Sequence, residues 1–384
     1  MIDGLPTSRT CPFDPPPELA ELRADAPVTR MRYPDGHEGW LVTSFDLARE
    51  VLAGDAFSAR HELRSSPIPM PVKIGPAAPG MFIGMDPPDH TRYRKPLSRT
   101  FTTRRTRELE PEIARICAET LDAMERQGSP ADLMKAFALP LPVLVISKLL
   151  GATPEVAEEF QALRVPVLTA GTPKEEAMAA ARRTGELMGE LVAYRRANPG
   201  DDLLSALIAD SDLDSQELAG ISLLILGAGH ETTANMISLA TYFLMSEERS
   251  LPVPFTDDAV NELLRHLSVV QFVSRAALRD VRLGPVTIKA GETVTLSLSA
   301  VNRDPGRFPD PDTARLDRDA SSHLAFGHGL HQCIGHNLAR AEIRIGLSEL
   351  FTRFPKIRLA VPDEEITTRE AMNTHGVHAL PVEW

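Results

Sequence analysis

The sequence has few cysteines, and this scarcity limits the class of protein that it encodes. Its 384 residues include only three, Cys11, Cys117 and Cys333, far apart in the chain. A disulfide framework needs more cysteines at regular spacings, and unpaired thiols are typical of a reducing compartment. We therefore expect a cytoplasmic protein without structural disulfides.

Long apolar runs and targeting segments are also missing. The longest apolar run, around Ile221–Ala228, is too short to cross a bilayer. The first residues, with Pro6, Pro12 and Pro15, lack the basic region and apolar core of a secretory signal. No repeat, low-complexity tract or linker divides the chain. We therefore expect one domain over residues 1–384 that does not bind a membrane.

Positive charge is in deficit as well. The chain has 41 lysines and arginines against 53 acidic residues, a net charge of −12. Because nucleic acids attract basic surfaces, this balance argues against nucleic acid as a partner. The exception is Arg92–Arg107, which holds seven lysines or arginines. Such a run is typical of a solvated helix face, but it also suits the docking of an acidic partner. Both interpretations can hold together.

Helical periodicity dominates the middle of the chain, and strand signals are short and few. The pattern predicts a mainly α protein with small β-sheets. One strand is expected at Gly39–Thr43, and the strands Val286–Ile288 and Thr293–Leu298 are expected to form a hairpin. A turn is expected at Gly171–Pro173. The predicted helices are Arg107–Gln127, Pro140–Leu150, Glu155–Val167, Lys174–Arg196 and a central buried helix at Ile221–Ala240.

The most informative segment is Phe326–Gly335, which places Cys333 in a glycine-rich loop just before an amphipathic helix. A helix N-terminus and free amide N–H groups lower the pKa of a nearby thiol, and thiolate is the metal-binding form. Gly327, Gly329 and Gly335 are expected to take positive φ, so that the backbone approaches a flat ligand. A lone cysteine near an apolar helix is more often a buried small hydrophobe.

A second unusual segment, Gly227–Thr233, lies within the predicted central helix. Two glycines, an acid and two hydroxyl residues are poor choices for a buried helix interior. One explanation is a close helix crossing with a hydroxyl bonded back to the preceding turn. The other is a locally widened helix beside a ligand, where Glu231 and Thr232 handle protons.

The two motifs together, in this order, resemble those of the cytochrome P450 superfamily of haem-thiolate monooxygenases. Phe326, Gly329, Cys333 and Gly335 fill the family's cysteine-ligand pattern without a gap. The resemblance covers nearly the whole chain and implies the single-domain P450 fold. It implies haem b with Cys333 as the iron ligand. Phe326, Gly327 and Gly335 would surround the haem, Ala228 and Gly229 would make room for O2, and Glu231 and Thr232 would deliver protons.

The same resemblance suggests partners for the two haem propionates, which need cations or hydrogen bonds when partly buried. The matching positions are His90, Arg94, Arg275 and His331. Glu262 and Arg265 resemble the family's Glu-x-x-Arg pair, which is structural. The arginine that usually completes this pair is absent from its expected place, and either Arg315 or Arg318 is the substitute.

The resemblance also implies a soluble bacterial enzyme, expected to be monomeric. Its electrons would come from NAD(P)H through an external ferredoxin reductase and ferredoxin, because the chain shows no flavin or nicotinamide fingerprint. The predicted substrate walls are apolar, which indicates a hydrophobic small organic substrate. They are the loop before Met85, the turn near Gly171, Ile225 and its neighbours, Leu267–Val273 and Thr374–His378, with Met81, Phe82, Val269, Val270, Phe272 and Val377.

The predicted function is therefore hydroxylation or epoxidation of a small molecule in secondary metabolism. A peroxide-driven enzyme, an oxidative ring-closing or aryl-coupling enzyme and a non-catalytic haem sensor are the alternatives. One departure from the family is the short segment Ser246–Thr256, where Pro252 and Pro254 should prevent a connecting helix.

Overall fold

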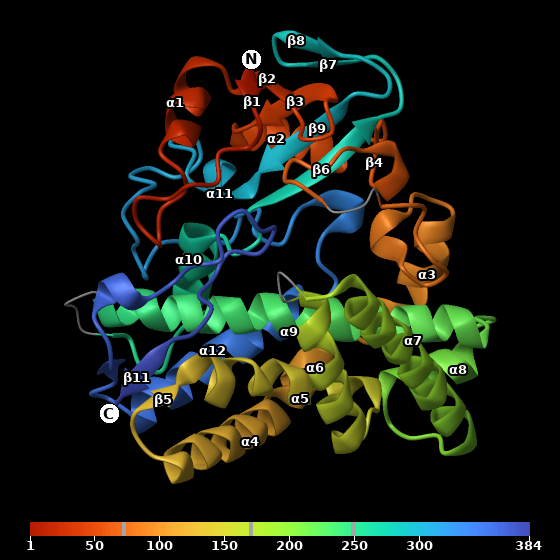
Figure 1. Cartoon of the computed structure of the whole chain (residues 1–384), viewed down its shortest axis with the longest axis vertical. Coiled ribbons are helices and arrows are strands. Elements are labelled where there is room, and N and C mark those ends of the chain that lie inside the picture. Colours follow the sequence, from red (N-terminus) through yellow and green to blue (C-terminus); the bar gives the residue numbers. More distant parts are fainter. Residues whose placement is uncertain (71–73, 169–171, 247–250) are drawn as a thin grey trace.

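A long helix, α9 (Ser215–Ser246), runs through the middle of the protein. The computed structural model describes residues 1–70, 74–168, 172–246 and 251–384. Figure 1 shows α9 crossing the molecule, with most strands on one side and most helices on the other. Residues from Leu218 to Leu244 are buried on nearly every side of α9. The prediction of a central buried helix is confirmed, and the helix extends beyond the predicted bounds at both ends.

The predicted helices are present, with small shifts at their ends. Pro140–Leu150 forms α5 with the predicted bounds. The helix expected at Arg107 begins earlier, at Thr103, because the Thr102 hydroxyl accepts a hydrogen bond from the Arg105 backbone N–H and caps it. The other helices are α1 (Glu18–Asp25), α2 (Phe45–Ala53), α3 (Asp89–Leu97), α4 (Thr103–Gln127), α6 (Pro154–Leu168), α7 (Lys174–Ala197), α8 (Leu203–Asp210), α10 (Asp257–Leu267), α11 (Leu298–Val301) and α12 (His336–Arg353).

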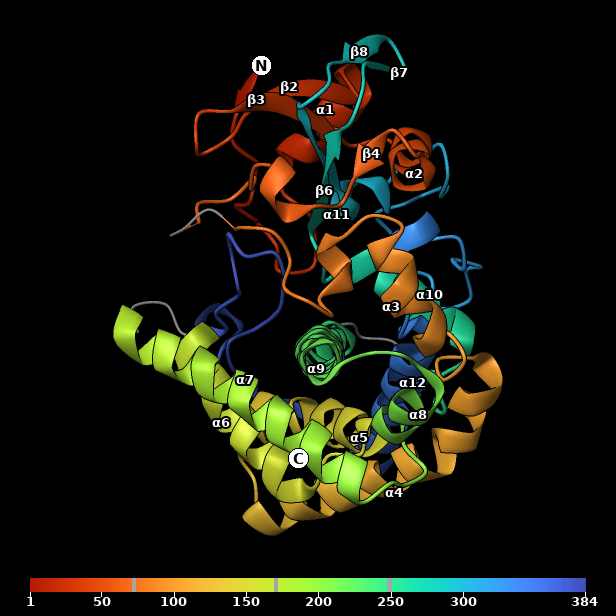
Figure 2. The ribbon, with the colours of Figure 1, turned by 90° about the vertical axis from the view of Figure 1, so that its right-hand side faces the viewer.

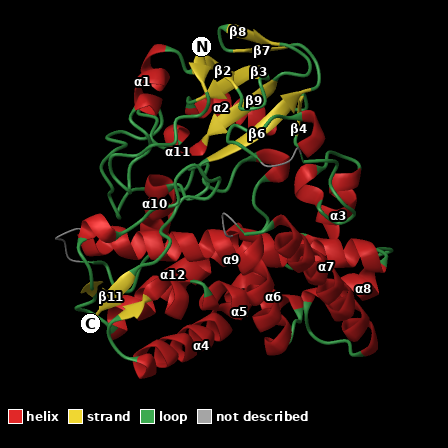
Figure 3. Cartoon of the chain, in the orientation of Figure 1, coloured by secondary structure: helices red, strands yellow, loops and turns green. Residues whose placement is uncertain are grey.

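The strands gather mainly in one sheet away from the helical layer, as Figure 3 shows. This sheet has the order β1-β2-β3-β9-β6-β4, and two smaller sheets have the orders β10-β11-β5 and β7-β8. The strand predicted at Gly39–Thr43 is present as β3. The bounds are β1 (Ile2–Asp3), β2 (Val28–Arg32), β3 (Glu38–Val42), β4 (Phe57–Ser58), β5 (Ala131–Asp132), β6 (Phe272–Ala277), β7 (Val281–Leu283), β8 (Val286–Ile288), β9 (Thr293–Ser297), β10 (Arg358–Leu359) and β11 (Pro381–Glu383).

The predicted hairpin between β8 and β9 is wrong, although both strands exist. β8 pairs with β7 across a tight turn at Gly284, where φ is +56°. β9 lies between β3 and β6 in the large sheet. All five residues of β9 are buried, so its backbone groups need partners along both edges. A hairpin partner would satisfy only one edge.

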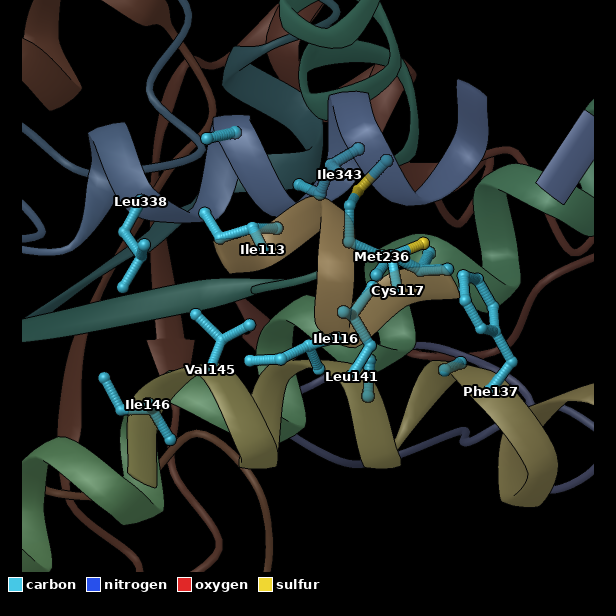
Figure 4. Close-up of a cluster of buried hydrophobic side chains, with 14 of the residues drawn as sticks. Ile113, Ile116, Cys117, Phe137, Leu141, Val145, Ile146, Met236, Leu338 and Ile343 are labelled. Carbon is cyan, nitrogen blue, oxygen red and sulfur yellow. The ribbon is translucent and has the colours of Figure 1, made fainter. Parts of the chain in front are cut away.

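The largest hydrophobic core lies where α4, α5, α9 and α12 meet. Figure 4 shows Ile116 and Cys117 of α4, Leu141 of α5, Met236 of α9 and Ile343 of α12 packed together. Burial raises the pKa of the Cys117 thiol to about 12, which identifies it as a structural cysteine. All three cysteines are unpaired, as expected.

Two further expectations concern segments next to undescribed residues. Gly171 of the predicted turn lies outside the described residues. Residues 247–250, part of the short segment Ser246–Thr256, lie outside them as well. From Leu251 to Thr256 the chain is irregular, in agreement with the effect expected of Pro252 and Pro254. In the part of the chain that the structure describes, no helix has the length and hydrophobicity required to cross a membrane.

Candidate active site

Cys333 lies at the end of a tightly folded loop before α12. The Cys333 N–H donates a hydrogen bond to the Phe326 carbonyl at 2.8 Å, which closes the loop. Gly327 and Gly329 have φ of +69° and +70°, as expected. A Cβ on Gly329 would lie 2.6 Å from the Leu52 carbonyl oxygen of α2, so only glycine fits there.

Gly335 differs from the expectation of positive φ, because its φ is −86°. Any residue can adopt this conformation. A Cβ at Gly335 would meet no protein atom within 4 Å. Neither a strained backbone nor a close protein neighbour therefore requires glycine here, and its backbone N–H donates a hydrogen bond to Cys333.

The acidity of Cys333 also differs from the expectation. Water can reach the side chain, yet so much protein surrounds it that burial raises the pKa of the thiol. The Gly335 N–H and the charges of Arg94 and Arg340 act in the opposite direction. The predicted direction of the pKa shift was wrong, because the desolvation of the thiolate outweighs the stabilisation that the helix N-terminus gives it. A positive ligand on the sulfur is therefore needed to favour the anion.

Phe326 ties the start of the loop to the helix that follows its end. The Arg340 guanidinium of α12 lies 4.7 Å from the centroid of the Phe326 ring. The rings of His323 and His336 lie 5.6 Å and 6.1 Å from it. These contacts, of which the cation–π contact is the strongest kind, hold both ends of the loop together.

The four basic residues predicted to bind an anionic group come together beside this loop. The rings of His90 (α3) and His331 are 4.3 Å apart. Arg94 donates a hydrogen bond to the carbonyl of Gln332, next to Cys333. Burial, together with the charges of Arg275, His90 and Arg94, lowers the pKa of His331 to about 3. We call His90, Arg94, Arg275 and His331 the cationic cluster, although its positive charge is carried by the two arginines.

Little negative charge balances the cationic cluster. Among the described residues, none of its members forms an ion pair with a carboxylate, and the neighbouring Asp86 accepts hydrogen bonds from the Ser58 hydroxyl and the Ala59 N–H instead. His90 is fully buried, and neither of its ring nitrogens has a hydrogen-bond partner. An unpaired buried polar group costs about 1–3 kcal/mol. The cluster therefore fits a polyanionic group that the protein itself does not supply.

Arg64 belongs to the same region, although the sequence gave no indication of it. Burial and the charge of Arg64 lower the pKa of Arg275 to about 10. The Nε of Arg64 is buried without a hydrogen-bond partner. Arg64 follows a single 3-10 turn, His61–Leu63, in an irregular segment. No motif or periodicity marks this position, so only the tertiary structure reveals it.

On α9, the second motif lies in a helix that is α-helical without interruption. The expected local widening is therefore absent. The Thr232 hydroxyl donates a hydrogen bond to the Ala228 carbonyl at 3.0 Å, which is the alternative that the sequence left open. Ala228 is exposed, although most residues in the middle of this helix are buried. A Cβ at Gly229 would lie 3.3 Å from Ile146 of α5, so this glycine also permits close packing of the two helices.

Glu231 has a partner that the sequence did not suggest. Its carboxylate forms an ion pair with the Arg369 guanidinium at 2.8 Å. Both side chains are largely buried, with 17% and 13% of their surface exposed. The two residues are far apart in the chain, and neither periodicity nor a motif connects them.

Comparisons with known proteins decide which family has this arrangement. Residues 247–377 match the cytochrome P450 family model. The chain is 44% identical over 379 residues to cytochrome P450 105C1 from Streptomyces sp, which covers 97% of this chain and 96% of the relative. It is 38% identical to pentalenic acid synthase from Streptomyces avermitilis, with 99% and 97% covered. The crystal structure of CYP105P1 in complex with filipin I matches with a TM-score of 0.92 at 41% identity, covering 100% of this chain and 99% of that one.

The chain belongs to the cytochrome P450 family. Its relatives are bacterial hydroxylases and oxygenases of secondary metabolism, so this P450 is a monooxygenase, an oxidoreductase. The family carries haem iron. The described residues offer no cluster of three or more His, Cys, Asp or Glu side chains for a metal ion. A haem iron needs only one thiolate ligand, and Cys333 is the cysteine of the loop described above.

The residues of this P450 fit a haem. Its two propionates are the kind of polyanionic group that the cationic cluster lacks, since both ring nitrogens of the buried His90 are unpartnered. Coordination to a metal deprotonates a thiol, and this offsets the effect of burial on Cys333. A Cβ at Gly335, two residues after this thiol, would also meet open space.

The Glu-x-x-Arg pair of this P450 is completely buried. Two hydrogen bonds of 2.7 Å and 2.8 Å join Arg265 to Glu262. Arg318 donates to the same carboxylate at 3.2 Å through its side chain, whereas Arg315 donates at 2.8 Å through its backbone N–H. The sequence left the second cation of this cluster open, and the structure identifies it as Arg318.

The predicted substrate walls come together only in part. Residues of Leu267–Val273 contact the C-terminal turn, because Val270 forms a β-bridge with Thr374 and the His375 N–H donates to the Val269 carbonyl at 2.7 Å. Val377 is buried in the main core. The other predicted apolar residues are buried or half-buried: Phe82, Val269 and Phe272 among the buried, Met81 and Val270 among the half-buried.

Proposed function

We propose that this P450 inserts one oxygen atom of O2 into a hydrophobic small organic molecule of secondary metabolism, by hydroxylation or epoxidation. The observation that carries this proposal is the unbalanced cationic cluster directly beside Cys333. Relatives support the type of substrate. One is named mycinamicin IV hydroxylase/epoxidase, and one solved relative is in complex with filipin I. The apolar character of Val269, Phe272 and Val377 agrees with such substrates.

In this proposal two groups of residues would hold haem b. Cys333 provides the iron ligand, and Phe326, Gly327 and Gly335 shape the loop that presents it. His90, Arg94, Arg275 and His331 bind the propionates, and Arg64 adds positive charge near Arg275. When a buried cation pairs with a propionate, the attraction between the two charges offsets part of the free-energy cost of removing that cation from water.

The bound haem supplies the activation of O2. The protein excludes water, orients the substrate and delivers protons. Thr232 and Glu231 are the proposed proton relay, because they are a hydroxyl and a carboxyl group close to the accessible Ala228 on α9. Ala228 and Gly229 leave room for O2 with their small side chains.

We further propose that electrons come from NAD(P)H through an external ferredoxin reductase and ferredoxin. The exposed residues Lys95, Arg99 and Arg104 lie on or between α3 and α4. This surface adjoins the cysteine loop, since Arg94 contacts Gln332 and Thr103 contacts Asn337. An acidic ferredoxin is complementary to it.

The proposal includes a single domain over residues 1–384 that acts as a cytoplasmic monomer. Contacts between the two ends of the chain support a single domain. The Arg9 guanidinium donates to Gln271 at 2.9 Å, and the His375 ring bonds the Pro12 carbonyl at 2.7 Å.

The decisive experiment is the spectrum of the reduced protein with carbon monoxide. The wild-type protein should show the red-shifted Soret band that thiolate ligation gives. The Cys333→Ser variant should lose it, because serine supplies no thiolate. The Cys117→Ser variant is the control, since Cys117 is buried in the core and should keep the band. An unchanged spectrum for Cys333→Ser would refute the proposed ligand.

The alternatives have distinct signatures. A peroxide-driven enzyme would turn over with peroxide as well as with a reductase system, and the presence of Glu231 and Thr232 argues against it. A sensor would bind haem but consume no reductant. A spectral-shift screen of organic ligands, followed by product analysis, separates oxygen insertion from ring closure or aryl coupling.

A further inference from the structure

The ion pair between Glu231 and Arg369 joins a residue of the proposed proton relay to the C-terminal part of the chain. Glu231 is on α9, whereas Arg369 follows the 3-10 turn Asp363–Glu365. The 2.8 Å distance and the small exposed fractions of both side chains limit the rotamers that either can adopt. Exposed ion pairs contribute little because water competes for both partners, but here water has limited access.

Arg369 belongs to a short antiparallel hairpin, which we define as the C-terminal hairpin, Thr367–His378. Its two sides are joined by a bridge between Thr368 and Val377, by the Arg369 N–H donating to the Gly376 carbonyl at 2.8 Å and by the His378 N–H donating to the Thr367 carbonyl at 3.0 Å. The backbone of Arg369 is therefore fixed, so the position of its guanidinium follows the position of the hairpin.

A second contact fixes the C-terminal hairpin on α9, one helical turn after Glu231. A Cβ on Gly376 would lie 2.0 Å from Oδ1 of Asn235, so the backbone of the hairpin lies directly against this side chain. Asn235 in turn donates a hydrogen bond to the Glu231 carbonyl at 2.8 Å. Figure 2, where α9 is seen end-on, shows the dark blue C-terminal part of the chain beside it.

The other side of the C-terminal hairpin contacts a predicted substrate wall. Val270 bridges Thr374, and the Gln271 N–H donates to the Asn373 carbonyl at 2.9 Å. Val377, which is also a predicted wall residue, is on the same hairpin. One small unit therefore contacts both the segment Leu267–Val273 and the acid on α9.

We propose that Arg369 is a positioning residue for Glu231, and that it makes proton delivery from α9 depend on how the C-terminal hairpin is seated. This inference rests on the proton role proposed above for Glu231. Arg369 holds the carboxylate in one orientation. A substrate that displaces the hairpin would move this guanidinium, and the carboxylate with it.

The test uses the haem-loaded enzyme without any organic substrate, reduced by NADPH through a plant-type ferredoxin and its reductase. Under these conditions O2 takes up either two electrons and two protons, giving hydrogen peroxide, or four of each, giving two molecules of water. The measured quantity is the fraction of consumed O2 that is recovered as hydrogen peroxide. When protons are delivered less efficiently, the O–O bond is cleaved less often, and a larger fraction of the O2 is released as hydrogen peroxide.

We expect Arg369→Gln to raise the peroxide fraction roughly three- to tenfold, because small displacements of catalytic groups have effects of this size or larger. Arg369→Lys should restore most of the wild-type value, since it retains the charge. The double variant Glu231→Gln with Arg369→Gln should match Glu231→Gln alone, because Arg369 acts only through that carboxylate. Arg358→Gln is the matched control, since Arg358 forms an exposed pair with Glu383.

A second measurement needs no turnover. Hydrogen exchange of the amides in Thr367–His378, followed by mass spectrometry on the haem-loaded protein, should become faster in Arg369→Gln and stay unchanged in Arg358→Gln. Gly376→Ala should increase both this exchange and the peroxide fraction, because the added Cβ displaces the hairpin from Asn235.

The outcomes separate this inference from the proposed function. If Glu231→Gln raises the peroxide fraction but Arg369→Gln does not, the positioning role is wrong and the role of Glu231 stands. If additive effects appear in the double variant, Arg369 acts elsewhere and the inference is overturned. If neither variant changes the fraction, the proton role of Glu231 fails and the inference fails with it. If the reduced wild-type protein with carbon monoxide showed no thiolate spectrum, the proposed function itself would be contradicted.

Discussion

The hydroxyl of Thr232 is bonded within its own helix, yet it is placed next to the accessible Ala228. We predict that Thr232→Ala keeps the fold and the thiolate spectrum but raises the share of reductant lost to hydrogen peroxide. The increase should be about three- to tenfold, which is smaller than the roughly 10²–10⁴-fold that a positioned general acid contributes to a rate, because peroxide is measured here as a share of the reductant consumed. Peroxide and reductant are measured together during turnover.

Thr241→Ala provides the control for Thr232→Ala. Thr241 also lies on α9, and its hydroxyl makes the same kind of bond, to the Ile237 carbonyl at 2.8 Å. It is completely buried away from the motif. If both variants release peroxide equally, the effect comes from the helix backbone and not from a proton donor.

The Glu262 carboxylate compensates two buried cations, Arg265 and Arg318. We predict that Glu262→Gln lowers the free energy of unfolding by roughly 3–5 kcal/mol, because removal of one member of a buried pair leaves a charge uncompensated. Urea unfolding of the haem-loaded protein measures this change. Glu383→Gln removes the same charge from an exposed pair with Arg358 and should cost less than about 1 kcal/mol. Equal losses in the two variants would contradict the importance of burial.

Among the structural elements, the C-terminal hairpin and the N-terminal segment depend on each other through His375. This side chain is fully buried, and its ring bonds the Pro12 carbonyl at 2.7 Å. Burial and the charge of Arg9 lower its pKa from 6.5 to about 4. Between these pKa values the unfolded chain binds a proton that the folded protein does not, so acidification destabilises the fold.

We therefore predict that His375→Gln reduces the acid sensitivity of the protein. In the wild type, His375 alone should lower the free energy of unfolding by about 3 kcal/mol between neutral pH and about pH 4. The variant lacks this contribution, so its unfolding free energy should decrease less over the same range. His378→Gln, at an exposed position in the same hairpin, should behave like wild type. An unaltered pH dependence in His375→Gln would show that this histidine is not responsible.

The whole molecule is acidic, with a net charge of −12, and its exposed basic surface on α3 and α4 is therefore a local exception. If a ferredoxin docks there, the rate at which it reduces the P450 should fall as ionic strength rises. Salt screens the attraction between the two charged surfaces, and at 0.1 M the screening length is about 10 Å. We predict that Lys95→Glu with Arg99→Glu raises the ferredoxin concentration needed for half-maximal reduction. Stopped-flow reduction measures this value.

Charge reversal far from this surface is the appropriate control. Arg182 and Arg196 are exposed on α7, and the pair of variants Arg182→Glu with Arg196→Glu alters the net charge equally. Equal weakening by both pairs would indicate a general charge effect and would contradict docking on α3 and α4.

Much of the fold was predictable because its strongest signals are local. The bounds of α5 and the burial of α9 follow from apolar residues that recur along short segments. Pairing of β9 was not predictable, because Thr293–Ser297 is buried on both faces and gives no alternation to indicate its neighbours. The predicted direction of the Cys333 pKa shift was wrong for a similar reason, since the amount of protein around the thiol depends on segments that are remote in the chain.

The sequence by itself determined the family and the chemistry of this P450, since the cysteine loop and the α9 motif are each contiguous and their spacings are fixed by local backbone geometry. Only the tertiary structure decided which residues act together. It identified Arg318 as the second cation bound to Glu262, placed Arg64 beside Arg275 and joined Arg369 to Glu231. Ion pairs and desolvation act through space, between residues at any separation along the chain, so no local sequence pattern indicates them.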